Sequence, residues 1–398
     1  MEFDKFTKQE ALAALFAAWQ PTRMTEQVAV DDSVGRVLAS EQCSLLSYPV
    51  VRASCMDGIA VASAAFAAAR PDLSGFALGR DYVRADTGDD FDDRFDAVIR
   101  IEDVTLLDGG GIALPEDLEV TAGMNVEPGG ASLAPGDFLL PAGWRIRPED
   151  TATLVRGGIT AVEVVQRPRV AFIPTGSELV PAGAQPQRGQ QVDCNSTFAR
   201  HMLSSYGAVP VIYPIVRDKA ADLASALDQA LVQADIVLIN GGSSKGEEDL
   251  NTTLVRQRGT VLCHGVLAAP GRPTLIGLID DKPVVVVPGP MVGCCYVFDW
   301  CIKAVVAHAL GTAPEQHQQV QAILTSDLKS PQVLEFWNRL EVRQTPEGYT
   351  AEPLSLHRGS GPYRIGVTSG QYINQIGEPP HKAGETLTVE LRANPACL

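Results

Sequence analysis

The chain has 398 residues, of which 45% are hydrophobic and 20% are charged, so it holds enough apolar sequence for several buried cores. At about 150 residues per domain, this length predicts two to four domains. The formal net charge of -16 would repel a phosphate polyanion, which argues against nucleic acid and anionic membranes as partners. The composition favours a protein that handles small molecules or metal cations.

The eight cysteines include no C-x-x-C pair, and the first residues carry no basic segment followed by an apolar core. The most apolar stretches, such as 235–240 and 283–288, fall far below the ~20 residues that a membrane span needs. We therefore expect a reduced, cytoplasmic protein without a membrane-spanning segment.

The first part of the chain predicts a helical linker domain with an insertion. Alanine and leucine recur at helical spacing over 5–20, and a short helical pattern lies within 28–44. Another helix is expected within 146–166, opened by Pro148 and closed at Gly157 and Gly158. Residues 1–44 and 141–166 are expected to pack together as one discontinuous domain.

Residues 45–140 have a different character, because short β-type runs alternate there with Gly, Pro and Asp turns. This pattern predicts a β-rich insertion domain. Its acidic run, Asp89 to Asp93, is typical of a solvated surface turn.

Residues 167–314 alternate buried strands with helices of 10 to 20 residues, which is typical of a mostly parallel sheet covered on both faces. Residues 315–398 return to short strands and predict a small C-terminal β domain of barrel type. The predicted fold class is multidomain α/β, with a three-layer α/β domain beside the linker, insertion and C-terminal domains. The expected α/β elements are strands at 170–174, 209–215, 235–240 and 284–287, and helices at 195–206, 219–233, 246–258 and 291–310.

Glycine-containing loops follow three of these strands, at the edge where open α/β sheets bind ligands. They are T-G-S-E-L at 175–179, G-G-S-S-K-G at 241–246 and P-G-P at 288–290. Glycine lets backbone N–H groups approach an anion, and a helix N-terminus adds a favourable dipole. The loops therefore suit a phosphate group, although glycines also serve as tight connections alone.

Carboxylates gather near the same strand ends, at Glu178, Asp193 and Asp249. Hard cations such as Mg²⁺ take carboxylate oxygens together with substrate phosphates. Asp193 and Asp249 are equally suited to cap helices, and both roles are compatible.

Motifs along nearly the whole chain resemble those of the MoeA-type molybdopterin molybdenumtransferase family, which is similar to the E domain of gephyrin. Their order and spacing, more than any one of them, carry the resemblance. The motifs are S-C-M-D-G-I-A-V at 54–61, T-G at 87–88, D-A-V at 96–98 with Glu102, T-G-S-E-L at 175–179, D-C-N at 193–195, G-G-S-S-K-G at 241–246 with Asp249, P-G-R-P at 270–273, P-G at 288–289 and R-G-S at 358–360.

The resemblance implies an activity on adenylylated molybdopterin. The family's enzymes hydrolyse the adenylate with a divalent cation, here Mg²⁺, and molybdate present, release AMP and place molybdenum on the dithiolene. Glu178 and Asp249 would be both catalytic and metal-binding. Asp57 and Thr87 would be catalytic residues supplied by the insertion domain of the other subunit, because family members are homodimers.

The resemblance also implies a set of residues that bind the pterin phosphate. Two further residues, Arg339 and Ser360, would line the molybdate side. Other molybdenum cofactor biosynthesis proteins or molybdoenzymes become expected partners. The implied cofactor-binding residues are Thr175, Gly176, Asp193, Asn195, Gly241, Gly242, Ser244, Lys245, Gly246, Pro270, Gly271, Arg272, Pro288, Gly289, Arg339 and Ser360.

Several positions depart from the family pattern. Ser132 stands where a carboxylate is expected, Gly265 and Ala269 stand near expected lysines, and Pro290 and Met291 alter the P-G-N-P loop. Each charge-assisted hydrogen bond lost from an anion site costs about 1.5–3 kcal/mol. Three functions stay open: a molybdopterin molybdenumtransferase, a non-catalytic carrier or scaffold, and an enzyme for another nucleotide-linked pterin. Whether molybdate or tungstate is used also stays open.

Overall fold

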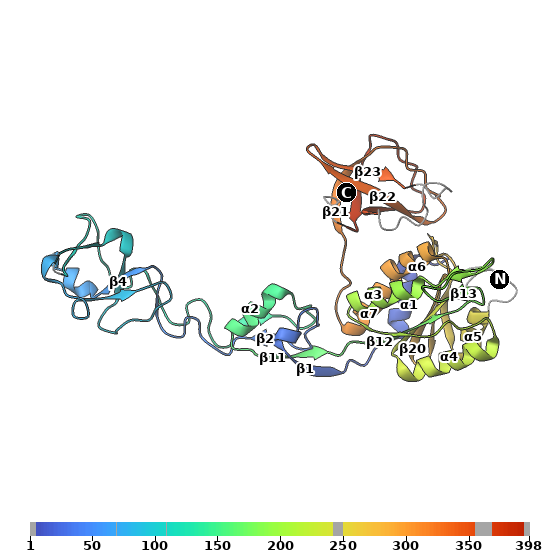
Figure 1. Ribbon diagram of the computed structural model, residues 1–398, viewed down its shortest axis with the longest axis horizontal. Helices are drawn as coiled ribbons and strands as arrows, with labels where there is room; N and C mark the ends of the chain where they lie inside the picture. Colours follow the sequence, from blue (N-terminus) through green and yellow to red (C-terminus); the bar gives the residue numbers. More distant parts are fainter. Residues whose placement is uncertain (1–4, 69, 109, 242–249, 355–367, 394–398) are drawn as a thin grey trace. The chain divides into compact units, whose positions relative to one another are not determined.

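The computed structural model describes residues 5–68, 70–108, 110–241, 250–354 and 368–393. The chain forms two compact units (Figure 1). Unit 1 combines Met1–Met24 with Gln166–Leu398, and unit 2 is Thr25–Val165. Unit 2 is therefore inserted between the N-terminal helix and the rest of unit 1.

The N-terminal helix α1 (Lys8–Ala18) belongs to unit 1. A capping box starts it, since the Thr7 hydroxyl accepts from the Glu10 backbone N–H while the Glu10 carboxylate accepts from that of Thr7. Its fully buried Ala11 and Leu15 share one face, and the helix contacts β17, β19 and α7. The expectation that this helix packs on the 148–156 helix in a linker domain was wrong, because its apolar face completes the α/β core.

The central sheet of unit 1 has six strands in the order β15-β12-β16-β20-β19-β17. The first four are parallel, which confirms the mostly parallel sheet, and the last two pairings, β20 with β19 and β19 with β17, are antiparallel. The hairpin between β19 and β20 was missed because its turn is Asp280 and Asp281, at φ 50° and 58°, where Asn-Gly is the usual signal. The strands are β12 (Arg169–Pro174), β15 (Val209–Ile212), β16 (Ile236–Asn240), β17 (Thr260–His264), β19 (Leu275–Ile279) and β20 (Lys282–Val287).

Helices cover both faces of this sheet. Ala171 and Ile173 of β12 lie in the core under α4 and α5, whereas Phe172 packs on Phe298 of the opposite layer, with ring centroids 6.2 Å apart. This alternation confirms the three-layer arrangement. The helices are α3 (Asn195–Ser205), α4 (Ala220–Gln233), α5 (Leu250–Arg258), α6 (Met291–Val297) and α7 (Lys303–Leu310), with a π-helical turn at Phe298–Ile302 between the last two.

The continuous helix Met291–Leu310 is long and apolar enough to cross a membrane by composition, with a mean hydropathy of 1.3. The expectation that no segment reaches this length was wrong. Within the described residues it is the one such helix, and 72% of its most apolar window is buried inside the protein. Burial of this kind is typical of a core helix, and Cys294 and Cys301 are fully buried in it.

The C-terminal sheet of unit 1 has the order β18-β22-β23-β21-β25-β24, and β22 also pairs with β24. This extra pairing closes the strands β22-β23-β21-β25-β24 into a ring, which confirms the barrel-like β domain. Its strands are β18 (Ala268–Ala269), β21 (Gln318–Leu324), β22 (Glu335–Thr345), β23 (Gly348–Pro353), β24 (Gly370–Asn374) and β25 (Thr386–Leu391).

Unit 2 has a part around helix α2 (Pro148–Arg156) and a β-rich part around a three-stranded sheet, β5-β4-β6. The helical pattern expected within 28–44 yields only a 3₁₀ turn, Val30–Asp32, because Gly35 follows with φ 78°. The strands are β1 (Thr25–Ala29) with β11 (Ala161–Val165), β2 (Gln42–Cys43) with β10 (Phe138–Leu140), β3 (Ala53–Ser54) with β9 (Val126–Glu127), β7 (Thr105–Leu106) with β8 (Ile112–Ala113), and β4 (Gly58–Val61), β5 (Tyr82–Ala85) and β6 (Ala97–Arg100).

Candidate functional site

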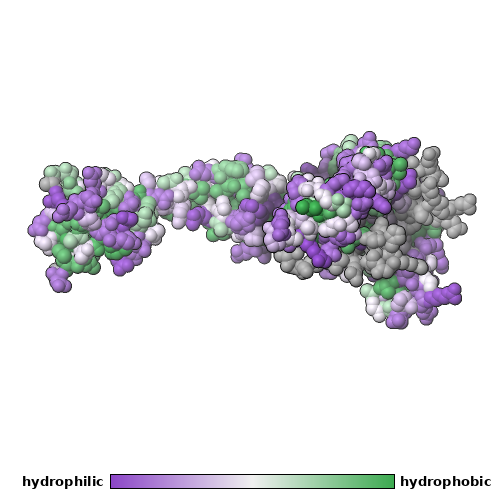
Figure 2. Space-filling model, turned by 90° about the horizontal axis from the view of Figure 1, so that it is seen from above, coloured by the Kyte–Doolittle hydropathy of each residue, from purple (hydrophilic) through white to green (hydrophobic). Residues whose placement is uncertain are grey.

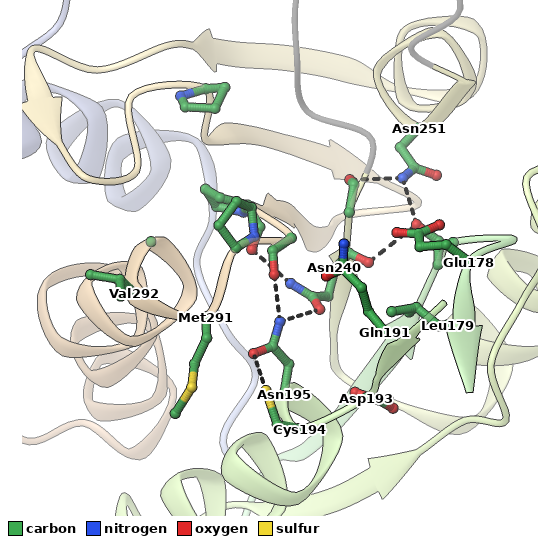
Figure 3. A pocket seen from close by; sticks show the side chains of 18 of the residues that line it. Glu178, Leu179, Gln191, Asp193, Cys194, Asn195, Asn240, Asn251, Met291 and Val292 are labelled. Carbon is green, nitrogen blue, oxygen red and sulfur yellow. Dashed lines mark hydrogen bonds between the residues drawn. The ribbon is translucent and has the colours of Figure 1, made fainter. Parts of the chain in front are cut away.

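A cavity of about 1100 Å³ lies in unit 1 at the carboxyl ends of β12, β16 and β20 (Figure 3). The loops that follow these three strands form its walls, together with the first residues of α3 and α6 and a small two-stranded pair, β13 (Leu179–Val180) and β14 (Gln191–Val192). This is the edge at which the sequence predicts a ligand site, because ligands of open α/β sheets bind beyond the strands' carboxyl ends.

Many of the predicted binding residues meet in this cavity. Arg272 does not line it and its side chain is exposed, while Arg339 lies on β22 with 4% of its surface exposed, where burial lowers the pKa of its guanidinium. Gly242, Ser244, Lys245, Gly246, Asp249 and Ser360 lie outside the described residues. The predicted residues that line the cavity are Thr175, Gly176, Glu178, Asp193, Asn195, Gly241, Pro270, Gly271, Pro288 and Gly289.

Glycine is required at two turns of the cavity wall. Gly241 has φ 125°, and a Cβ there would lie 2.6 Å from the carbonyl oxygen of Thr175. Gly176 has φ 153°, and its Cβ would lie 2.7 Å from Glu178 Oε2. A side chain at either position would displace backbone or carboxylate atoms that form the cavity.

Of the residues that the structure describes, three carboxylates line the cavity: Glu178, Asp193 and Asp218. Asp193 Oδ1 accepts from the Ser196 N–H at 3.0 Å, so it caps the start of α3 as well as lining the cavity. Asp218 Oδ2 accepts from the Ser177 N–H at 3.0 Å. Within the described ranges, no three His, Cys, Asp or Glu side chains are grouped as a metal site.

Three asparagines connect the loops of the cavity, and Figure 3 shows Asn195, Asn240 and Asn251 with the hydrogen bonds between them and their neighbours. Asn240 Nδ2 donates to the Pro288 carbonyl at 2.8 Å, and Asn240 Oδ1 accepts from Asn195 Nδ2 at 2.9 Å. Asn195 Nδ2 also donates to the Gly289 carbonyl at 2.7 Å.

Asn251 connects the other two strand-end loops, those of Thr175 and Gly241. Its Nδ2 donates to Thr175 Oγ1 at 3.1 Å and to the Gly241 carbonyl at 2.9 Å. The side chains of Asn240 and Asn251 therefore bind backbone or side-chain atoms of all three strand-end loops.

Sequence reasoning missed Asn240, Asn251, Asp218 and Cys194 as cavity residues. Asn240 had a signal, since it is a polar residue that ends an otherwise apolar buried strand. Cys194 stands inside the D-C-N motif, and burial, with a contribution from the Asp193 carboxylate, raises the pKa of its thiol. The thiol is therefore protonated at neutral pH.

In unit 2, the predicted catalytic residues Asp57 and Thr87 are in direct contact. Asp57 Oδ1 accepts from the Thr87 backbone N–H at 2.7 Å and from the Thr87 hydroxyl at 2.8 Å. These two hydrogen bonds lower the pKa of the exposed Asp57 carboxyl, so it is ionised at neutral pH.

Two other sequence expectations concern unit 2. The Ser132 hydroxyl, at a position where the family pattern has a carboxylate, donates to Glu127. Asp89, Asp90, Asp92 and Asp93 are exposed, which confirms the solvated acidic turn.

Comparison with known protein families gives two matches that follow one another along the chain. Residues 6–158 match the MoeA N-terminal region (domain I and II), and residues 171–308 match a probable molybdopterin binding domain. This chain belongs to the MoeA family. The second match contains every described residue that lines the cavity.

Relatives of this MoeA-family protein match it over most of its length. It is 27% identical over 383 residues to the molybdopterin molybdenumtransferase of Haemophilus influenzae, covering 93% of this chain and 94% of that one. It is 25% identical over 385 residues to the Bacillus subtilis protein of the same name, with coverages of 92% and 90%.

A solved structure extends this likeness to the fold. The molybdopterin biosynthesis MoeA protein of Pyrococcus horikoshii matches with a TM-score of 0.79 and 26% identity, covering 98% of this chain and 99% of that one. The match supports the family's multidomain arrangement, including the C-terminal barrel-like domain.

Proposed function

We propose that this protein is a molybdopterin molybdenumtransferase of molybdenum cofactor biosynthesis. It would hydrolyse adenylylated molybdopterin in the presence of molybdate, release AMP and leave molybdenum on the dithiolene. The observation that carries the proposal is that the family motifs of three separate loops converge on one cavity of about 1100 Å³, in a chain matched along most of its length by proteins with this name. The alternative of a non-catalytic carrier is not favoured by these relatives.

The charge of the cavity supports a role for a divalent cation. Glu178, Asp193 and Asp218 line it, and the described lining residues include no lysine or arginine. An adenylyl phosphate would meet net repulsion there unless a cation came between them. Carboxylate oxygens are the ligands that Mg²⁺ prefers, so the donor set fits this ion.

In this proposal Glu178 would hold Mg²⁺ together with Asp249, and the ion would neutralise charge on the phosphate during hydrolysis. The glycine turns at Gly176 and Gly241 would let backbone atoms approach the ligand. Asp57 is held ionised by Thr87 and would act from unit 2 of the second subunit. Arg339 and Ser360 would bind on the molybdate side.

The test is a turnover assay with purified full-length protein and adenylylated molybdopterin, following AMP with molybdate and with or without Mg²⁺. We expect AMP release that requires Mg²⁺ and is reduced at least tenfold in Glu178→Gln. Molybdopterin bound without any AMP release would support the carrier instead, and tungstate in place of molybdate would settle the choice of oxyanion.

We also propose a homodimer. On unit 2, segments around β2, β10 and α2 expose several large apolar side chains in the same region, which Figure 2 shows as hydrophobic surface. They are neighbours because Ser44 N–H donates to the Asp137 carbonyl and Leu45 N–H to that of Gly157. Exposed apolar patches of this kind mark protein contacts. The residues are Leu45, Leu46, Tyr48, Phe138 and Val155, and Tyr48 joins the group because Arg156 of α2 lies over its ring.

Sedimentation analysis tests the dimer, and Leu45→Asp should shift it to monomer while the exposed Val232→Asp on α4 should not. A monomeric wild-type protein would contradict the proposal.

We further propose that the protein acts in the cytoplasm, in keeping with the free thiols of its described cysteines. We also propose that it passes its product to other cofactor biosynthesis proteins or molybdoenzymes.

A further inference from the structure

Asn240 occupies a central place in the cavity wall. It is the last residue of β16, lines the cavity and has only 2% of its surface exposed. Its backbone carbonyl accepts from the Thr175 N–H at 2.8 Å and from the Thr175 hydroxyl at 3.1 Å. The backbone of Asn240 therefore fixes the first strand-end loop, while its side chain is free to bind elsewhere.

The orientation of the Asn240 amide is set by its partners. The Pro288 and Val287 carbonyls, at 2.8 and 3.4 Å, are acceptors only, so Nδ2 must face them. Oδ1 then faces Asn195, whose own Nδ2 is directed by the Gly289 carbonyl as well. The network is consistent in this single arrangement.

We propose that Asn240 is a positioning residue for the ligand cavity, which holds the Pro288–Gly289 loop and the start of α3 in register with the Thr175 and Gly241 loops. It acts through these four segments and does not take part in the chemistry. An aspartate at this position would keep an acceptor for Asn195 but would turn a carboxylate oxygen toward two carbonyls. A leucine would keep the volume and remove every side-chain hydrogen bond.

A matched control exists in the C-terminal β domain. Asn374 is 1% exposed, its Nδ2 donates to the Pro331 carbonyl at 3.0 Å, and its Oδ1 accepts from Asn338 Nδ2 at 3.3 Å. It reproduces the chemistry of Asn240 outside the cavity. Asn374→Leu therefore measures what such a network contributes to folding alone.

The first measurement is hydrogen–deuterium exchange of the full-length protein and does not depend on activity. We expect faster exchange than in wild type over 286–294 in both Asn240→Leu and Asn240→Asp, and over 193–199 in Asn240→Leu alone. Asn374→Leu should leave both segments unchanged at a similar loss of thermal stability. Exchange over 286–294 that is no faster in Asn240→Leu than in Asn374→Leu would overturn the proposal.

The second measurement rests on the proposed function and follows AMP release from adenylylated molybdopterin. We expect kcat/KM to fall at least tenfold in Asn240→Leu and Asn240→Asp, and to stay within twofold of wild type in Asn374→Leu. An unchanged kcat/KM in both Asn240 variants would overturn the positioning role. Absence of AMP release by the wild type would instead count against the proposed function, and the exchange result would still decide on Asn240.

Discussion

Lys8 of α1 and Glu335 of β22 form a buried ion pair, with Nζ and Oε2 2.7 Å apart. Lys8 also donates to the Tyr296 hydroxyl at 3.0 Å, and the Tyr296 ring stacks on Trp337. The ion pair joins α1 directly to the C-terminal β domain of unit 1. Tyr296 adds a contact from α6, the helix that begins at the ligand cavity.

Lys8→Met should destabilise unit 1, because Glu335 would be left as an unpaired buried charge. We expect the free energy of unfolding to fall by about 3–5 kcal/mol in urea denaturation. Lys382→Met removes a surface pair with Asp327 and should cost less than about 1 kcal/mol. Equal losses in the two variants would mean that the Lys8 pair contributes no more than a surface pair.

Asp299 should make unit 1 sensitive to acid. Its burial opposes ionisation, but the hydrogen bond from His317 and the charges of Arg392 and Lys303 outweigh burial and hold the pKa of the carboxyl well below its usual value. A lowered folded-state pKa contributes stability above the unfolded pKa, near 3.9, and that stability is lost as pH falls further.

Urea denaturation between pH 2.5 and 7 tests this linkage. The free energy of unfolding should fall below about pH 4 by up to about 1.4 kcal/mol per pH unit for this group. In Asp299→Asn the protein should be less stable at pH 7 and the slope should be smaller. An unaltered slope in Asp299→Asn would contradict the assignment.

Gly241→Ala should damage the cavity directly. The new Cβ would lie 2.6 Å from the Thr175 carbonyl oxygen at φ 125°, so the loop must move. Displacements of about 1 Å at such sites cost on the order of 100-fold in rate, which we expect for AMP release. Gly384→Ala also places a side chain at positive φ, but nothing lies within 4 Å of its Cβ, so it should lose stability without losing rate. Similar rates in both variants would exclude the Thr175 contact as the cause.

Thr87→Val should test the Asp57 contact in unit 2. The variant loses the hydroxyl donor at 2.8 Å but keeps the backbone N–H donor, so the Asp57 pKa should rise partway toward its usual value. We expect AMP release to fall on the order of tenfold through loss of orientation. Thr87→Ser retains the hydroxyl and should keep most of the rate. A full rate in Thr87→Val would remove the hydroxyl from the proposed machinery.

The sequence predicted the strand-end site because buried parallel strands are continuous apolar runs and their glycine loops follow directly. It could not predict what α1 packs against. Ala11 and Leu15 indicate a buried face, but the partner strands lie far along the chain. The long helix at 291–310 was placed correctly.

The residues of the candidate site also fall into those that the sequence predicted and those that it missed. Thr175, Gly241 and Gly289 were predicted because motifs carry them, and glycine is needed at Gly241 for its backbone conformation and its close approach to Thr175. Asn240 was missed because an asparagine before a glycine turn usually signals the turn itself, and Asn251 was missed because it lies within α5 and no quoted motif includes it. Arg272 was predicted from a motif, yet the direction of an exposed side chain in a loop depends on packing that no motif encodes.

The insertion of unit 2 affects the order in which the two units can fold while the chain is being translated. Residues 25–165 are continuous in sequence and contain every helix and strand of unit 2. This unit can therefore fold as soon as residue 165 has been synthesised. α1 is made before unit 2 but contacts β17, β19 and α7, and its Lys8 pairs with Glu335. The apolar face of α1 therefore stays without its native contacts while more than half of the chain is synthesised. A chaperone that binds nascent apolar helices would be expected to bind this protein at α1.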